Sequence, residues 1–324
     1  MLPEPLVGPY GGGALDRAAS LVEHGVNAVW FHGFDAKAFD ACDQHGLAAC
    51  VEFPTFRADF RRYPELIPTG ADGKPIRYGS LVQGICLSQA WFLDQIEERL
   101  VAGVEKYEPA GIWLDYLTYA GWFETPEPDL QESCFCPDCV ETFRAASGLD
   151  VSGPAEILSR HARAWRNHKC LRIARLGAKY SAIIRSHRRH CLVGIYMCPW
   201  TPDEFDGALS RIFAQDYRLL APLVDVFTPL IYAQKSGRPA TWAGEFMDGS
   251  RDFVPRRRLL QPILDVLDFP ASMTCLTEAA TPSWGVQLFA GAEVFADGTK
   301  AEQFARLAEA LRQRWSSRDG NSQA

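Results

Sequence analysis

The sequence has no run of about 18 consecutive apolar residues, the length that a membrane-spanning helix requires. Residues 1–5 also lack the positively charged and apolar stretches of a secretory signal peptide. In a chain without an export signal, the ten cysteines indicate thiols or metal ligands rather than a disulfide framework. We therefore expect a cytoplasmic protein with no membrane partner.

Two kinds of cofactor site are also missing from the sequence. Histidine occurs seven times but never as a His-x-His pair, which argues against a metal-dependent hydrolase of the barrel type. No G-x-G-x-x-G motif follows an early apolar run, although residues 11–13 are all glycine, so a dinucleotide-binding fold is disfavoured. The sequence thus predicts no organic cofactor.

The sequence has fewer basic than acidic residues. The 33 Lys and Arg residues against 40 Asp and Glu residues give a formal net charge of −7, which argues against nucleic acid as a partner. Arginines do cluster at residues 185–189 and 256–258. We interpret both groups as solvent-exposed ends of helices or strands, and we expect the partner to be a small molecule.

Short apolar runs alternate with helical patterns along the whole chain. Each run is apolar on both faces, as strands are in a parallel sheet covered by helices. Eight such units in 324 residues predict a single (β/α)₈ TIM barrel over residues 1–315, with long loops after the third and fourth strands. Residues 316–324 are predicted to form a disordered polar tail. The expected strands are residues 6–10, 26–31, 47–53, 111–116, 191–197, 224–232, 259–266 and 285–290, and the expected helices include residues 36–45, 134–147, 154–188 and 203–220.

Active sites of such barrels lie at the carboxyl ends of the strands. In this sequence those ends carry acids, aromatic residues and one histidine. Aromatic faces beside carboxylates suit a sugar, and cleavage of a glycosidic bond needs two carboxyl groups. The residues expected to contact substrate are Tyr10, Trp30, His32, Tyr116, Trp122, Trp200, Tyr232 and Asp265. The tryptophans among them can equally cap the barrel, and His32 can equally be structural.

Asp115 is the strongest catalytic candidate. It ends the apolar run Gly-Ile-Trp-Leu, where a core strand meets the expected pocket. Its role would be nucleophile, or general base if the enzyme inverts configuration; the alternative is a structural carboxylate in a salt bridge or a helix cap. The candidates for the second carboxyl group are Glu52, Glu124, Asp203 and Glu204. Asp203 and Glu204 also fit the start of a helix, where acids are favoured by the helix dipole.

Residues 134–139 form a C-x-C-x-x-C run with Cys134, Cys136 and Cys139. Three thiolates so close in sequence can converge on one zinc ion, which binds sulfur tetrahedrally. Cys86 is the best fourth ligand, because it ends the long loop after the third strand, adjacent to the next loop in a barrel. Free thiols and a redox pair are the alternatives. A bound zinc ion would be structural and would connect two long loops.

The region from residue 39 to residue 148 resembles a broad set of bacterial hypothetical glycosyl hydrolases. The stretches that carry this resemblance are residues 48–53 (AACVEF), 83–86 (QGIC), 111–116 (GIWLDY) and 134–139 (CFCPDC), followed by residues 199–207 (PWTPDEFDG). The four cysteines are also similar to the zinc cluster of family 42 β-galactosidases. That family places an Asn-Glu pair after its fourth strand, with the Glu as acid/base. Because Leu114-Asp115-Tyr116 stands here instead, its mechanism does not carry over.

An aspartate nucleophile on the fourth strand is similar to α-galactosidase and amylase barrels, although the sequences otherwise do not match those. The leading hypothesis is a retaining glycosidase that acts on a small glycoside or oligosaccharide. One alternative is an inactive barrel that binds carbohydrate. The other is a sugar lyase or isomerase that uses Asp115 and His32 as acid and base.

Overall fold

Strands and helices alternate along residues 4–78 and 84–321, the part of the chain that the computed structural model describes. The strands pair in parallel in the order β5-β4-β3-β2-β1-β9-β8-β6-β7, and β5 also pairs with β6, which closes the sheet into a barrel. The strands are β1 (Val7–Tyr10), β2 (Ala28–His32), β3 (Ala48–Pro54), β4 (Gly111–Asp115), β5 (Leu192–Met197), β6 (Val226–Ile231), β7 (Leu259–Leu260), β8 (Ile263–Asp265) and β9 (Val286–Phe289).

The barrel has eight strand positions because β7 and β8 share one of them. Both pair with β6, β7 with its first half and β8 with its second half. Gln261 and Pro262 separate the two pieces, and a proline cannot donate a ladder hydrogen bond. The prediction of a single (β/α)₈ barrel is confirmed.

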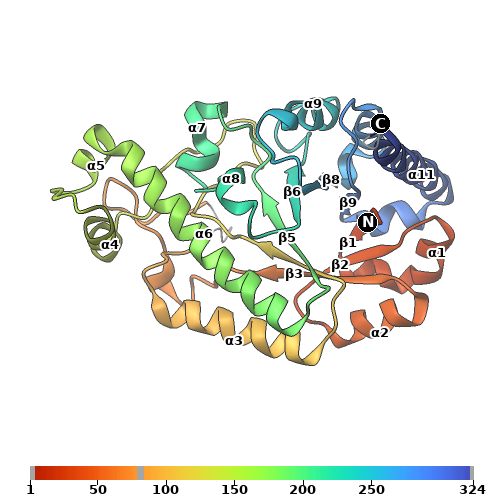
Figure 1. Cartoon of the computed structure of the whole chain (residues 1–324), viewed down its shortest axis with the longest axis horizontal. Helices are drawn as coiled ribbons and strands as arrows, with labels where there is room; N and C mark the ends of the chain where they lie inside the picture. Colours follow the sequence, from red (N-terminus) through yellow and green to blue (C-terminus); the bar gives the residue numbers. More distant parts are fainter. Residues whose placement is uncertain (1–3, 79–83, 322–324) are drawn as a thin grey trace.

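Helices surround the barrel (Figure 1). The α-helices are α1 (Ala18–Glu23), α2 (Ala36–His45), α3 (Ala90–Lys106), α4 (Pro137–Ser147), α5 (Pro154–Arg160), α6 (Ala162–His187), α7 (Glu204–Arg211), α8 (Tyr217–Leu220), α9 (Trp242–Gly249), α10 (Ala271–Glu278) and α11 (Gly298–Asn321). Short 3-10 helices cover Gly12–Arg17, Pro64–Leu66, Ser250–Asp252, Val266–Asp268 and Gly291–Ala296. No helix in the described ranges is long and apolar enough to cross a membrane.

The structure differs from the sequence prediction at several helix ends. The helix expected at residues 203–220 is two helices, because Gln215 turns inward to bond the end of β5: its amide contacts the Tyr196 carbonyl at 2.9 Å and the Cys198 N–H at 2.8 Å. Asp216 then caps α8. The helix expected at residues 154–188 breaks at His161, and α11 continues through residues 316–321, where a disordered tail was predicted. Gln83 and residues 322–324 lie outside the described residues.

The barrel interior is filled by large side chains. The Trp113 indole occupies space that Gly111 and Gly194 leave free, since a Cβ on either glycine would lie 2.4 Å from it. Trp113 Nε1 donates to Thr228 Oγ1 at 2.7 Å. Trp30 packs edge-on against Trp113 and is completely buried. These indoles form the layer of the core that lies under the active-site end of the barrel.

Candidate active site

A cavity of about 510 Å³ opens at the carboxyl end of the barrel. Strand ends supply part of its lining, namely Tyr10, His32, Asp115, Tyr196, Ile263 and Phe289, and the loop after β4 supplies Tyr116, Thr118, Gly121, Trp122, Phe123 and Glu124. Arg57, from the loop after β3, also lines the cavity. The structure thus brings two predicted catalytic carboxyl groups, Asp115 and Glu124, to one pocket.

Asp115 lies against Glu52 on the neighbouring strand, since the β3–β4 register pairs Pro54 with Asp115. Withdrawal from water and the Glu52 carboxylate both raise the pKa of Asp115 well above its usual value, and the hydrogen bond between the two carboxyl groups raises it further. The Tyr116 N–H lies 2.9 Å from Asp115 Oδ1, and this hydrogen bond lowers the pKa of Asp115, but by less than burial and Glu52 raise it. Two adjacent carboxyl groups in a poorly hydrated site hold one proton between them. Its surroundings therefore favour the protonated form of Asp115.

Glu52 is only 1% exposed and lies directly behind the pocket. Its Oε2 accepts a hydrogen bond from the Tyr10 hydroxyl at 3.1 Å and forms an ion pair with His32 Nδ1. The hydrogen bond to Glu52 raises the pKa of His32, because a carboxylate partner favours the charged imidazole. Glu52 therefore contacts two pocket residues as well as Asp115.

The residue after Asp115 has an unusual backbone. Tyr116 has a φ of 54°, in the left-handed region that non-glycine residues seldom occupy. Its ring lies 5.9 Å from the Arg57 guanidinium, and Arg57 lowers the pKa of Asp115 in part. Strained backbone of this kind is concentrated at functional sites, and here it turns the chain directly beside the central carboxyl group.

Glu124 has a different electrostatic environment from Asp115. Lys235 Nζ lies 3.4 Å from Glu124 Oε2 and 2.7 Å from Asp265 Oδ2, and it rests 4.7 Å from the centres of the Tyr232 and Phe289 rings. Burial raises the pKa of Glu124 above its usual value, and Lys235 offsets only part of that rise. A nearby cation favours the charged carboxylate, whereas the charged group with the largest effect on Asp115 is another acid, Glu52.

Several predicted site residues lie elsewhere. Glu204 accepts a hydrogen bond from the Thr201 N–H at 2.6 Å and pairs with Arg238. Asp203 is exposed, precedes α7 and makes no side-chain cap hydrogen bond. Trp30 is in the barrel core, and Trp200 is packed against aromatic side chains with 2% of its surface exposed. Neither tryptophan lines the cavity, and both are buried. The physical reason is the same for both: neighbouring strands and loops enclose each indole completely.

Asp265 is buried beneath Lys235 and caps the following turn through the Leu267 N–H at 2.9 Å. Tyr232 and Trp122 do line the cavity, as do Tyr10, His32 and Tyr116.

The sequence analysis did not identify Arg57, Lys235 and Phe289 as site residues. Phe289 ends the eighth barrel strand and could have been found by the rule that named the other strand ends. Arg57 and Lys235 lie in loops, and only the folded chain places them beside carboxylates.

Four cysteines form a second cluster between the two long loops. The Sγ atoms of Cys86, Cys134, Cys136 and Cys139 all lie within 4.8 Å of one another. Cys86 Sγ is 3.6 Å from that of Cys136 and 3.8 Å from that of Cys139, far beyond the length of about 2.05 Å of a disulfide. A zinc ion with bonds of about 2.3 Å to sulfur separates tetrahedral ligands by about 3.8 Å. The donor set and its spacing therefore fit a tetrahedral metal ion.

Neither protein-family models nor curated protein sequences match this chain. Solved structures do. The glycoside hydrolase domain of PgaB (BpsB) from Bordetella bronchiseptica superposes with a TM-score of 0.70 at 12% identity, covering 94% of this chain and 99% of that one. A β-galactosidase from Rahnella sp. R3 gives a TM-score of 0.69 at 12% identity over 96% of this chain. A catalytic mutant of Gan42B, a GH42 β-galactosidase from G. stearothermophilus, gives a TM-score of 0.64 at 13% identity, also over 96% of this chain.

This chain covers 57% of each of these two β-galactosidase chains, little more than half of their length. At such low identity the likeness establishes the fold, and the structural neighbours are (β/α)₈ barrels of glycoside hydrolases. The resemblance to glycosyl hydrolase barrels inferred from the sequence is confirmed at that level.

Proposed function

We propose that this protein is a glycosidase that hydrolyses a small glycoside or oligosaccharide in the pocket around Asp115. The observation that carries the proposal is a pocket that presents two carboxyl groups beside aromatic walls, one next to the acid Glu52 and the other paired with Lys235. Glycoside hydrolysis uses this combination, one carboxyl group that holds a proton and one that is charged. The glycoside hydrolase neighbours support the same reaction class.

Asp115 is the proton donor in this proposal. The neighbouring Glu52 raises the pKa of Asp115, so that Asp115 stays protonated until it transfers the proton to the leaving oxygen. The sequence favoured Asp115 as nucleophile; its surroundings favour the role of general acid instead. Tyr10 and His32 both contact Glu52 Oε2 and hold Glu52 in place beside Asp115.

Glu124 is the second carboxyl group. Lys235 favours its ionised form, and in that form it acts on the anomeric carbon either directly or through a water molecule. Lys235 also contacts Asp265 and the two rings beneath it, which hold its ammonium group in place. The aromatic side chains of Trp122, Tyr232 and Phe289 supply apolar surface for a sugar ring.

The direct test is a screen of the full chain against aryl glycosides and short oligosaccharides, with product analysis by mass spectrometry and NMR. A new reducing end that carries oxygen from water is the expected product. Saturable sugar binding without turnover of any compound would favour the carbohydrate-binding alternative. An unsaturated or isomerised product without water incorporation would favour the lyase or isomerase alternative.

The dependence of kcat/KM on pH should report the Asp115 proton. A general acid acts only while protonated, so activity should fall as pH rises through the raised pKa of Asp115. Glu52→Gln removes the neighbouring negative charge, lowers that pKa and should move the alkaline limb to lower pH by about one unit or more. Glu204→Gln is the matched control outside the pocket and should leave the limb in place. An alkaline limb that is unmoved, or moved upward, by Glu52→Gln would contradict the proposed role.

Trp122 should contribute to substrate binding rather than to the chemical step. It lines the pocket and stacks on Phe123, with ring centres 6.3 Å apart. Trp122→Ala is expected to raise KM by roughly tenfold, the loss of about 1.4 kcal/mol of contact with the sugar face. Trp122→Phe keeps an aromatic face and should raise KM by less than about threefold. Equal effects of the two variants would show that the ring does not bind sugar.

The four-cysteine cluster is proposed to hold one structural zinc ion. Cys86 comes from the loop after β3, while Cys134, Cys136 and Cys139 precede or begin α4. The Thr69 N–H donates to Cys134 Sγ at 3.3 Å, a contact that orients a metal-ligating thiolate. When bound, the ion would connect the two long loops, one of which carries Trp122 and Glu124. It has no chemical part in the proposed reaction.

A further inference from the structure

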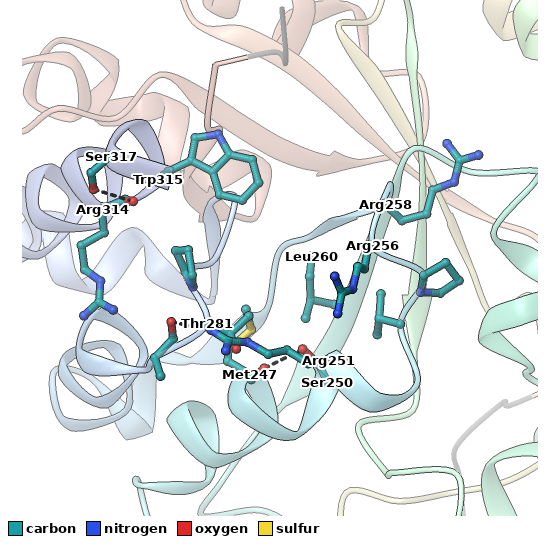
Figure 2. Close-up of a pocket in the computed structure, with 14 residues that line it drawn as sticks. Met247, Ser250, Arg251, Arg256, Arg258, Leu260, Thr281, Arg314, Trp315 and Ser317 are labelled. Atoms are coloured by element: carbon teal, nitrogen blue, oxygen red, sulfur yellow. Dashed lines mark hydrogen bonds between the residues drawn. The ribbon is translucent and has the colours of Figure 1, made fainter. Parts of the chain in front are cut away.

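A second large cavity lies at the opposite end of the barrel from Asp115. Its volume is about 600 Å³, and Figure 2 shows the side chains that line it. They come from the end of α9 and the segment that follows it, from the start of β7, from the connection between α10 and β9, and from the end of α11. Because these segments precede β7 and β9, the cavity lies near the amino ends of the strands. It shares no lining residue with the pocket around Asp115.

The lining of this cavity is strongly positive. Arg251, Arg256, Arg258 and Arg314 contribute to it, and none of the described side chains in the lining is acidic. Among the side chains described, which are those of residues 4–78 and 84–317, none forms an ion pair with any of these four guanidinium groups. A chain with a net charge of −7 therefore places four arginines around one concave site. Arg256 and Arg258 belong to the run that the sequence analysis interpreted only as solvent-exposed.

Two of the four guanidinium groups are fixed by main-chain carbonyls. Arg314 donates to the Thr277 carbonyl at 2.6 Å and to the Ala279 carbonyl. Arg251 donates to the Ala280 carbonyl at 2.8 Å. These neutral acceptors position the side chains without cancelling their charge, which lowers the entropy that a ligand must remove on binding.

The rest of the lining is suited to a small molecule with an organic part. Met247, Leu260 and Trp315 provide apolar surface, and Figure 2 shows Trp315 across the cavity from Leu260. Thr281 Oγ1 is buried and has no hydrogen-bond partner among the described residues. The nearby acid Asp248 is exposed and accepts from the Thr281 N–H at 2.7 Å. The volume is in the range of about 300–1,000 Å³ of ligand pockets.

We propose that this cavity is a binding site for a small organic phosphate. Guanidinium groups match phosphate oxygens with paired, charge-assisted hydrogen bonds, and the apolar wall is available to the organic part of the ligand. A concave site on an acidic protein favours a small anion over a polymer such as nucleic acid. The site is separate from the proposed catalytic pocket, so it does not depend on the proposed activity.

Isothermal titration of the full chain with inorganic phosphate, glucose 6-phosphate and glucose tests this proposal. Inorganic phosphate and glucose 6-phosphate should bind, and glucose should bind more weakly than either. An Asp115→Asn variant should bind the two phosphates with the same affinity as the unaltered protein. The double variant Arg256→Gln, Arg258→Gln should weaken phosphate binding by roughly tenfold or more. Arg257→Gln, a neighbouring exposed arginine outside the lining, is the control and should change it by less than about twofold.

Arg256 and Arg258 are chosen because, unlike Arg314, they do not hold the end of α10, and equal melting temperatures of the variants would verify the fold. Absence of phosphate and glucose 6-phosphate binding up to about 10 mM would overturn the proposal. An equal loss of phosphate affinity in the double variant and in Arg257→Gln would also overturn the proposal. Binding of a polyanion such as heparin, without binding of either small phosphate, would overturn it as well.

Discussion

Asp115→Asn is expected to lower kcat/KM by about three orders of magnitude or more on glycosides with poor leaving groups. Asn cannot donate a carboxylic proton to the leaving oxygen, so the assistance proposed for Asp115 is lost. The fold should be retained. Asn keeps the acceptor that Asp115 Oδ1 presents to the Tyr116 N–H, and it is neutral, as the protonated Asp115 is. The melting temperature should therefore shift by less than about 2 °C.

The choice of leaving group separates the general-acid role from the nucleophile role. A dinitrophenyl glycoside releases a stable anion that needs no proton, so a variant that lacks only the general acid should cleave it far better than an alkyl glycoside. A missing nucleophile would impair both substrates equally. Asp203→Asn, an exposed aspartate before α7, is the matched control and should leave both rates unchanged. Full activity of Asp115→Asn on alkyl glycosides would reject Asp115 as a catalytic residue.

Loss of the four-cysteine site is expected to have the largest effect on stability. Protein purified without chelator should contain about one zinc per chain, and Cys136→Ser should contain less than about 0.2. The melting temperature of Cys136→Ser should fall by about 5 °C or more. The physical reason is that the metal ion contributes its binding free energy only when the loops after β3 and β4 are folded together.

Cys275→Ser provides the control for this prediction. Cys275 is partly exposed on α10 and lies outside the cluster, so its replacement should change neither zinc content nor melting temperature. Metal analysis by inductively coupled plasma mass spectrometry and thermal unfolding with and without chelator give the two readouts. Unaltered protein with less than about a tenth of an equivalent of zinc would contradict the proposal.

Local sequence patterns predicted the order of strands and helices well. Runs such as residues 111–116 are apolar on both faces, and only a strand buried between a packed barrel interior and covering helices satisfies both faces. The same pattern placed Asp115 at the carboxyl end of the fourth strand, where the structure has it. The helix at residues 203–220 was predicted as continuous, because its break depends on Gln215, which bonds to residues of β5.

The cysteine cluster was also predictable in part. The spacing of Cys134, Cys136 and Cys139 at the start of a helix restricts where their thiols can lie, so sequence alone suggested convergence. The contribution of Cys86 depends on how two loops about 50 residues apart in the chain pack together, and the structure places its thiol within 4.8 Å of the other three. Which tryptophans face the pocket could not be predicted, because barrel strands bury some indoles, such as Trp30, that lie beside strand ends.

The amino-acid sequence by itself determined the barrel, the position of Asp115 and the closely spaced thiols of the cysteine run, since each follows from residue types at short spacing. Only the tertiary structure decided the electrostatics. Glu52 raises the pKa of Asp115 because β3 and β4 are neighbours, and Glu124 meets Lys235 because two distant loops converge. The charge state of a carboxyl group depends on groups within a few ångströms in space, and their separation along the chain does not specify them.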